Sequence, residues 1–304
     1  MRTHLAGSNF LNARTADLFE PALHEIRPKA ASLIVSIYGD AIEPRGGIVW
    51  MGNLISICAA FSISETHVRT AVSRLVAAGQ LIGEREGRKS YYRLTGEAQQ
   101  EYLRAANVLF FERPRPERWC FRTVSEPEDE ERLRTAGFTP VAAGLWVGPE
   151  WIGPSAIAGL PGTSVFQSAQ SGNPTAVAAF ARAFWALDEL GARYDGFLRL
   201  FDPWLTQDSI ASSLGPEGCF LARVLLVHAY RGILLKDPHL PEDATGADWP
   251  GRAARRLFAE LYIRLSPPAD RYIGASFQTA DGALPECTEK SMARLKSLHV
   301  LAGS

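Results

Sequence analysis

The chain has 304 residues, enough for two or three domains, and 46% of them are hydrophobic, enough for buried cores. Its formal net charge is −1, so a strongly positive surface has to be local rather than spread over the whole protein. The cysteines lie far apart with no C-x-x-C pair, which argues against a zinc ribbon or a disulfide scaffold and suits a reducing cytosol: Cys58, Cys120, Cys219 and Cys287.

The first segments of the chain predict helices and no targeting signal. The start lacks the long apolar core of a signal peptide, and residues 17–21 fit a short helix to which we assign no function. Pro28 is placed to open a second helix that continues to Tyr38. We expect Gly39-Asp40 and residues 44–47 to break the chain after it.

Residues 50–94 carry the pattern of a helix-turn-helix. An apolar run to Phe61 and a turn at 62–64 precede a second helix that reaches Ala78. Ser62 stands three residues before Glu65, which is the spacing of a capping box and predicts the start of this helix. A stripe at helical spacing predicts its buried face: Val68, Ala71, Val72, Leu75 and Val76. The opposite face carries side chains able to donate to phosphates or base edges: Thr66, His67, Arg69, Thr70, Ser73 and Arg74.

A basic hairpin is expected directly after this helix. Gly79 is placed to end the helix, and residues 81–82 and 91–94 can pair as strands around a turn at 86–89. From Thr66 to Thr95 there are six Lys or Arg and two Glu, so positive charge is concentrated in this segment. The order of elements is that of a winged helix and predicts duplex DNA as the partner. Two alternatives stay open: an ordinary amphipathic helix with a solvated basic face, and a winged helix that serves protein–protein or dimer contacts.

A third helix, a linker and a short α+β domain are expected next. Thr95 can cap a helix that reaches about Phe111 and serves either dimer contacts or the connection to the next domain. Two prolines among charged residues mark 112–118 as a linker. Strands are predicted at 119–124, at 138–147 with a break at Ala143-Gly144, and around 165–166, with a charged helix at 127–136. This alternation predicts an α+β domain.

The last part of the chain is predicted to be helical. Apolar side chains at helical spacing between 175 and 190 are interpreted as a stripe facing the core rather than a ligand site: Val177, Phe180, Ala181, Phe184, Leu187 and Leu190. Further helices are expected at 219–235 and 252–265, and the tail from Asp281 is expected to be peripheral. The most apolar segment, 220–230, is short and contains Arg223 and His228, so we expect no membrane span and a cytoplasmic protein.

Segments between Arg27 and Tyr272 follow one another as in a known family: residues 32–40, 69–75, 87–95, 137–138, 145–147, 228–231, 237–241 and 248–251. On these segments the chain resembles the PaaX-type transcriptional repressors of phenylacetate catabolism. The resemblance implies an α+β multidomain protein, with a winged helix at 27–112, a ferredoxin-like domain similar to Cas2 at 118–171 and a helical domain at 174–275. It also implies a homodimer that represses an aromatic-acid catabolic operon until an aryl-CoA thioester such as phenylacetyl-CoA releases it, without any cofactor. Ala229 departs from the family, which more commonly has an acidic residue there.

For the DNA contacts, the hypothesis places residues 64–78 in the major groove. Arg69 is the first choice for a bidentate contact to guanine, with Thr66, His67, Thr70 and Ser73 as secondary candidates. Arg74 is expected either at a phosphate or in a salt bridge within the domain. Arg88 and Lys89, with the neighbouring Tyr91, are expected at phosphates or the minor groove. A two-fold dimer then requires an inverted repeat in the operator.

An aryl-CoA effector needs cations for its phosphates and an apolar slot for its ring. The candidates for the cationic clamp are Arg231, Arg255 and Arg256, and those for the slot are Trp204, Tyr230 and Trp249. Each of these six residues also has an ordinary structural interpretation.

An enzyme is the main rival class, and its motifs are missing from the sequence. We find no Gly-x-Ser-x-Gly, no His-Glu-x-x-His and no phosphate-binding glycine loop. A metal-dependent nuclease is disfavoured because the predicted strand 119–124 has no aspartate. His228, Asp237 and His239 match no strong metal-ligand spacing, so solvated or capping roles are favoured and no metal is expected. A ligand-sensing dimer whose winged helix serves protein contacts remains the other alternative.

Overall fold

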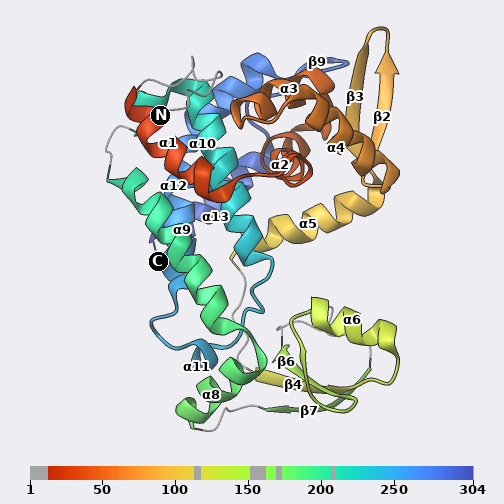
Figure 1. The fold of residues 1–304 in the computed structure, drawn as a ribbon, viewed down its shortest axis with the longest axis vertical. Coiled ribbons are helices and arrows are strands. Elements are labelled where there is room, and N and C mark those ends of the chain that lie inside the picture. Colours follow the sequence, from red (N-terminus) through yellow and green to blue (C-terminus); the bar gives the residue numbers. More distant parts are fainter. Residues whose placement is uncertain (1–12, 113–117, 151–161, 169–172, 207–209, 304) are drawn as a thin grey trace, which may run out of the picture. The chain divides into compact units, whose positions relative to one another are not determined.

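The computed structural model describes residues 13–112, 118–150, 162–168, 173–206 and 210–303. The fold is mixed, mostly helical with small antiparallel sheets (Figure 1). The chain divides into two compact units. The first unit comprises Met1–Glu112, Phe197–Gly232 and Arg255–Ser304, and the second comprises Arg113–Gly196 and Ile233–Ala254.

The first unit opens with helices that run further than the sequence pattern predicts. Helix α1 spans Ala13–Ile26 and α2 spans Ala30–Ile37, with Lys29 as its N-cap. The break predicted at Gly39-Asp40 is wrong, because the chain continues in a π-helical turn (Tyr38–Ile42) and a 3-10 turn (Glu43–Arg45). It leaves helical geometry only at Gly46, whose φ is 110°. Asp40 therefore lies on a helical turn and is fully buried.

Helices α3 (Met51–Ala60) and α4 (Glu65–Ala77) follow strand β1 (Ile48–Trp50). The N-cap of α4 is Ser64, whose Oγ accepts a hydrogen bond from the backbone N–H of His67 at 3.4 Å. The predicted capping box of Ser62 is therefore wrong: Ser62 lies in the turn with a φ of 61°. The predicted apolar face is buried at Val68, Ala71, Val72 and Leu75, but Val76 is 40% exposed and lies outside it.

The predicted hairpin is present and completes a three-stranded sheet. Strands β2 (Leu81–Glu86) and β3 (Lys89–Leu94) pair antiparallel, and the sheet order is β1-β3-β2. Two turn residues join Glu86 to Lys89, and Gly87 takes the positive φ of 58° that glycine tolerates best. Helix α5 (Gly96–Phe110) begins at the predicted cap, where Thr95 Oγ1 accepts from the N–H of Ala98 at 3.2 Å.

Long helices provide the rest of the first unit's core. They are α9 (Leu187–Leu205) from Phe197 onward, α10 (Ile210–Leu234) up to Gly232, α12 (Pro250–Ser276) from Arg255 onward, and α13 (Glu289–Gly303). The short hairpin of β8 (Gln278–Thr279) and β9 (Gly282–Ala283) follows α12. By length and composition α10 is apolar enough to span a membrane, but 61% of its most apolar window is buried inside the protein, as in a core helix. The prediction of a peripheral tail is wrong, because Arg294 of α13 is buried and donates to the carbonyl of Gly39 at 2.9 Å.

The second unit contains a four-stranded antiparallel sheet. Its strands are β4 (Arg118–Thr123), β5 (Thr139–Ala142), β6 (Leu145–Glu150) and β7 (Thr163–Ser168), in the order β5-β6-β4-β7. Helix α6 (Pro127–Thr135) connects β4 to β5, so the predicted order of strands and helix is confirmed in this unit. Most of the predicted linker, residues 113–117, lies outside the described residues.

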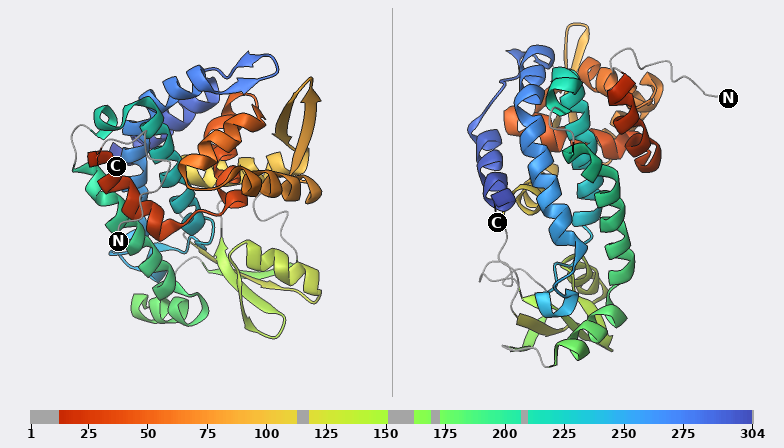
Figure 2. Two further views of the ribbon diagram at one scale, coloured as in Figure 1. Left: turned by 45° about the horizontal axis from the view of Figure 1, so that its top comes forward. Right: turned by 90° about the vertical axis from the view of Figure 1, so that its left-hand side faces the viewer.

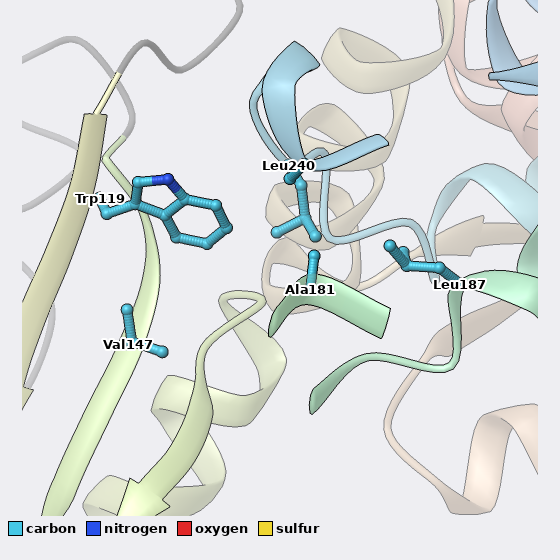
Figure 3. Close-up of a cluster of buried hydrophobic side chains, with 6 residues drawn as sticks. Trp119, Val147, Ala181, Leu187 and Leu240 are labelled. Carbon is cyan, nitrogen blue, oxygen red and sulfur yellow. The ribbon is translucent and has the colours of Figure 1, made fainter. Parts of the chain in front are cut away.

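Helices α8 (Pro174–Phe184) and α11 (Glu242–Thr245) share a core with this sheet. Figure 3 shows that core, which joins side chains of Trp119, Val147, Ala181, Leu187 and Leu240. Trp185 packs against this core, and its indole Nε1–H donates to the carbonyl of Gly137 at 3.0 Å. The predicted core stripe of 175–190 is confirmed at Ala181, Leu187 and Leu190, but Phe184 remains 39% exposed.

Candidate nucleic-acid interface and its connection to the C-terminal helices

Helix α4 presents one continuous polar and basic face to solvent. Its apolar side chains point into the module, so the residues between them are left exposed: Thr66, His67, Arg69, Thr70, Ser73 and Arg74. The structure thus brings all six predicted helix contacts onto one surface. Local hydrogen bonds order part of it, since Thr70 Oγ1 donates to the carbonyl of Thr66 at 2.8 Å and His67 Nδ1 lies 2.9 Å from Ser64 Oγ.

Arg69 already has a partner on its own helix. Its Nη2 lies 2.7 Å from Glu65 Oε1, one helical turn earlier, and the two side chains are 58% and 57% exposed. An exposed pair of this kind contributes little to stability and is screened by salt. Glu65 therefore orients the guanidinium of Arg69 through a weak ion pair. The guanidinium can exchange this carboxylate for the edge of a base.

The β2–β3 hairpin adds a second group of cations. Arg88 and Lys89 are exposed at its turn, as predicted, and Arg85 is exposed on the preceding strand. Arg93 is also exposed, but its Nε lies 2.9 Å from Glu84 Oε1 across the hairpin. Net positive charge is therefore concentrated at the turn of the hairpin, because Glu84 balances the charge of Arg93 farther from the turn.

Tyr91 has a different position from the other predicted contacts. Its side chain is only 6% exposed, on the central strand β3 opposite Trp50 of β1 and Glu84 of β2. It packs inside the sheet, so we do not retain it among the candidate contacts. Lys89 and Arg93, two residues away on either side, share this face of β3, but both have exposed side chains.

A buried network of charges lies beneath this module, and it was not predicted from the sequence. Arg223 of α10 lies 2.9 Å from Asp40 of the π-helical turn and 2.7 Å from Asp270 of α12. Asp270 also pairs with Arg45 at 2.7 Å. All four side chains are 5% exposed or less, and two positive charges match two negative ones. A sequence signal for this network was present. Asp40 and Arg223 each stand in an apolar stretch, and buried charged residues are almost always paired with an opposite charge.

Further hydrogen bonds surround this pair of carboxylates. Tyr262 donates its hydroxyl to Asp40 Oδ1 at 2.9 Å, and burial raises the pKa of Tyr262, so the hydroxyl keeps its proton. Burial opposes the charge of Arg223, but the nearby carboxylates outweigh this effect and raise the pKa of Arg223. Arg223 therefore keeps its charge, and the network joins the turn after α2 to helices α10 and α12.

A second contact joins α10 directly to α2, the helix that packs against α4. His228 Nδ1 lies 2.9 Å from Ser36 Oγ, and Ser36 Oγ donates to the carbonyl of Ser32 at 3.1 Å. Burial, with a smaller contribution from Arg231, lowers the pKa of His228 to about 4, so the imidazole is neutral at pH 7. Since the only hydroxyl proton of Ser36 is used, Nδ1–H of His228 donates to Ser36 Oγ.

His228 therefore forms a hydrogen bond in the first unit. Asp237 and His239, the other two residues considered as metal ligands, form hydrogen bonds in the second unit. Asp237 accepts the N–H of His239 at 2.6 Å and the hydroxyl of Tyr194 at 2.8 Å, which is a turn-forming role. Within the described parts of the chain, no three His, Cys, Asp or Glu side chains are grouped to hold a metal ion.

The predicted effector residues occupy separate places. Trp204 and Tyr230 lie in the aromatic core of the first unit, where the Tyr230 and Phe258 rings stack at 4.4 Å. Arg255 donates to the carbonyls of Val108 and Phe111 at the end of α5. Arg231 donates to the carbonyl of Ser32, and Arg256 is exposed. Trp249 packs on Tyr194 in the second unit. The structural roles are thus seen for most of the six.

Comparison with known proteins adds an independent finding. A family model described as "PaaX-like protein" matches residues 29–98, and one described as "PaaX-like protein C-terminal domain" matches residues 185–275. The transcriptional repressor PaaX of Escherichia coli K12 is 31% identical over 281 residues, which cover 87% of this chain and 89% of that protein. Among solved structures, the uncharacterized protein Rv0674 of Mycobacterium tuberculosis is 22% identical, with 80% of this chain and 98% of that one covered and a TM-score of 0.47.

Proposed function

This chain belongs to the PaaX-like protein family, and on that premise we propose that it is a transcriptional repressor that binds duplex DNA. The observation that carries the proposal is the exposed face of α4 beside the basic β2–β3 hairpin. The E. coli relative bears the name of a transcriptional repressor, which agrees with the expectation that this chain is not an enzyme.

In this proposal, residues 27–112 form a winged helix. The order of α3, α4, β2 and β3 supports it, with α4 as the helix that enters the major groove and the hairpin as the wing. The strand order β5-β6-β4-β7 supports a ferredoxin-like domain at 118–171, and α9, α10 and α12 supply most of a helical domain at 174–275. The two compact units divide the chain differently, since residues 197–232 and 255–304 belong to the same unit as residues 1–112.

Arg69 is proposed as the base-reading residue. A bidentate arginine–guanine contact discriminates against other bases by about 1–3 kcal/mol. Thr66, His67, Thr70 and Ser73 are proposed as further contacts to base edges or phosphates. Arg74, Arg88 and Lys89 are proposed to neutralise phosphates, which adds affinity at any sequence and makes binding sensitive to salt.

We further propose that the repressor is a homodimer on an inverted repeat and that it controls an aromatic-acid operon of the phenylacetate type. An aryl-CoA thioester such as phenylacetyl-CoA is the proposed effector. Release requires that the C-terminal helices influence the DNA-binding module. The buried pairs of Arg223 with Asp40 and of His228 with Ser36 support such coupling, because any shift of α10 disturbs the turn after α2 and α2 itself.

The proposal is tested by fluorescence anisotropy of the full chain on its own upstream intergenic DNA, at two salt concentrations, with and without phenylacetyl-CoA. We expect tight binding that weakens steeply with salt and is relieved by the thioester. Binding that ignores the thioester would retain the repressor and refute this effector. Failure to bind this and other operators, with retained thioester binding, would favour a ligand sensor whose winged helix serves protein contacts.

A further inference from the structure

Lys89, at the start of β3, is held by two groups from distant parts of the chain. Its Nζ lies 5.1 Å from the ring centroid of Trp50, and the same atom lies 3.4 Å from Oε1 of Gln278. An ammonium over an indole face is attracted by the ring, and the amide oxygen accepts one of its protons. Most surface lysines are free to sample many rotamers, whereas this one is guided from two sides.

Trp50 is itself fixed in place. It is the last residue of β1 and lies opposite Tyr91 in the sheet. Its ring covers Gly52 in the first turn of α3 so closely that a Cβ on Gly52 would come within 2.4 Å of it. Because Gly52 has no side chain, it leaves space for the indole of Trp50. The ring is thereby held in position next to the ammonium of Lys89.

Gln278 is also fixed, through Asn53 of α3. The Nδ2 of Asn53 donates to the carbonyl of Ser276 at 2.8 Å, and its Oδ1 accepts the N–H of Gln278 at 3.0 Å. One amide side chain therefore binds the backbone on both sides of Phe277. This fixes strand β8, which packs against β1. Figures 1 and 2 show the β8–β9 hairpin beside the β2–β3 hairpin.

We propose that Trp50, Asn53 and Gln278 are positioning residues that hold Lys89 ready for a DNA phosphate. The proposal rests on the proposed function and extends the DNA-binding apparatus to the segment directly after α12. Placing a flexible cation before binding reduces the conformational entropy lost in the complex. Arg88, one residue earlier, makes no polar side-chain contact within the described part of the chain, so it serves as the unsupported cation for comparison.

The test compares Asn53→Ala, Gln278→Ala and Lys89→Ala in the full chain, with Asn107→Ala on the exposed surface of α5 as the matched control. If Lys89 contacts a phosphate, its removal lowers the slope of log affinity against log salt by about 0.9. We expect Asn53→Ala and Gln278→Ala to lower the slope in part. Each should have little further effect in the Lys89→Ala background but a full effect in the Arg88→Ala background. Additive effects with Lys89→Ala would overturn the proposal.

A second measurement needs no DNA and separates this proposal from the proposed function. Acetylation of lysines in the free protein, followed by mass spectrometry, reports how accessible each ammonium is. We expect Asn53→Ala and Gln278→Ala to increase the labelling rate of Lys89 while that of Lys236 stays unchanged. Unchanged labelling of Lys89 in folded variants would overturn the positioning role even if the wild type binds DNA. Altered labelling in a protein that binds no DNA would keep the positioning contact and reject its proposed purpose.

Discussion

Arg223 and Asp40 are separated by 183 residues in sequence and form an ion pair of 2.9 Å between side chains that are 1% and 0% exposed. Arg223 belongs to the helix that the C-terminal family model covers, and Asp40 lies in the segment that the N-terminal model covers. The two matched regions therefore share one buried core. This explains why the first compact unit combines Met1–Glu112 with helices from much later in the chain.

Loss of Asp40 should destabilise the protein strongly. Asp40→Ala leaves Arg223 with one of its two carboxylates and removes the acceptor of the Tyr262 hydroxyl. Removing one partner of a buried pair costs about 3–5 kcal/mol. We expect a loss of this size in the free energy of unfolding by urea, with Asp281→Asn on the exposed hairpin unchanged. If Asp40→Ala does not fold, Asp40→Asn, which keeps the side-chain volume, should show a smaller loss in the same direction. A loss below about 1 kcal/mol for the alanine variant would contradict the network.

His228 should make stability depend on pH in a specific window. Its pKa is lowered from 6.5 to about 4 in the folded protein, so the unfolded state binds the proton more readily. The contribution of His228 to stability is therefore complete above pH 6.5 and is lost as the pH falls from there towards 4, up to roughly 3 kcal/mol. Unfolding free energies of the wild type and His228→Gln, measured between pH 4 and 7.5, should differ by an amount that changes across this window. Parallel curves would show that His228 does not titrate in this way.

Ser64 and Ser62 should respond differently to substitution. Ser64 caps α4, so Ser64→Ala should cost about 1 kcal/mol of stability. Ser62 has a φ of 61°, so Ser62→Gly should be neutral or slightly stabilising because glycine tolerates this geometry. Thermal unfolding of the two variants distinguishes the cap seen in the structure from the capping box predicted from sequence. A larger loss for Ser62→Gly than for Ser64→Ala would reverse the assignment.

Patterns within one element were predictable from sequence where the local order of residues decides them. Local sequence predicted most of the buried stripe of α4, a turn within residues 86–89 and the helix cap at Thr95. The start of α4 was misplaced because serines stand on both sides of Ile63, and only the backbone geometry tells which of them is the cap. Val76 sits at the edge of the stripe, where helical spacing does not determine burial.

Contacts between distant segments were not predictable from spacing. Gly39-Asp40 has the composition of a chain break, but Arg223 and Tyr262 supply the partners that keep Asp40 buried on a helical turn. Likewise, Arg294 ties the tail to the carbonyl of Gly39. In the candidate interface, the exposed face of α4 was predictable. The support of Lys89 by Trp50 and Gln278 was not, because no periodic pattern links Lys89 to Trp50 or to Gln278, which lies 189 positions later in the sequence.

In the proposed complex, α4 lies in the major groove with Arg69 at a guanine. Methylation interference on the upstream DNA tests it most directly, because methylation at guanine N7 blocks the acceptor that a bidentate arginine needs. We predict that one guanine in each half of an inverted repeat interferes with binding of the wild type. The same guanine should lose its effect with Arg69→Ala but keep it with Arg104→Ala, a control on the exposed surface of α5. Tight binding with no interfering guanine, or an unchanged pattern for Arg69→Ala, would contradict the account.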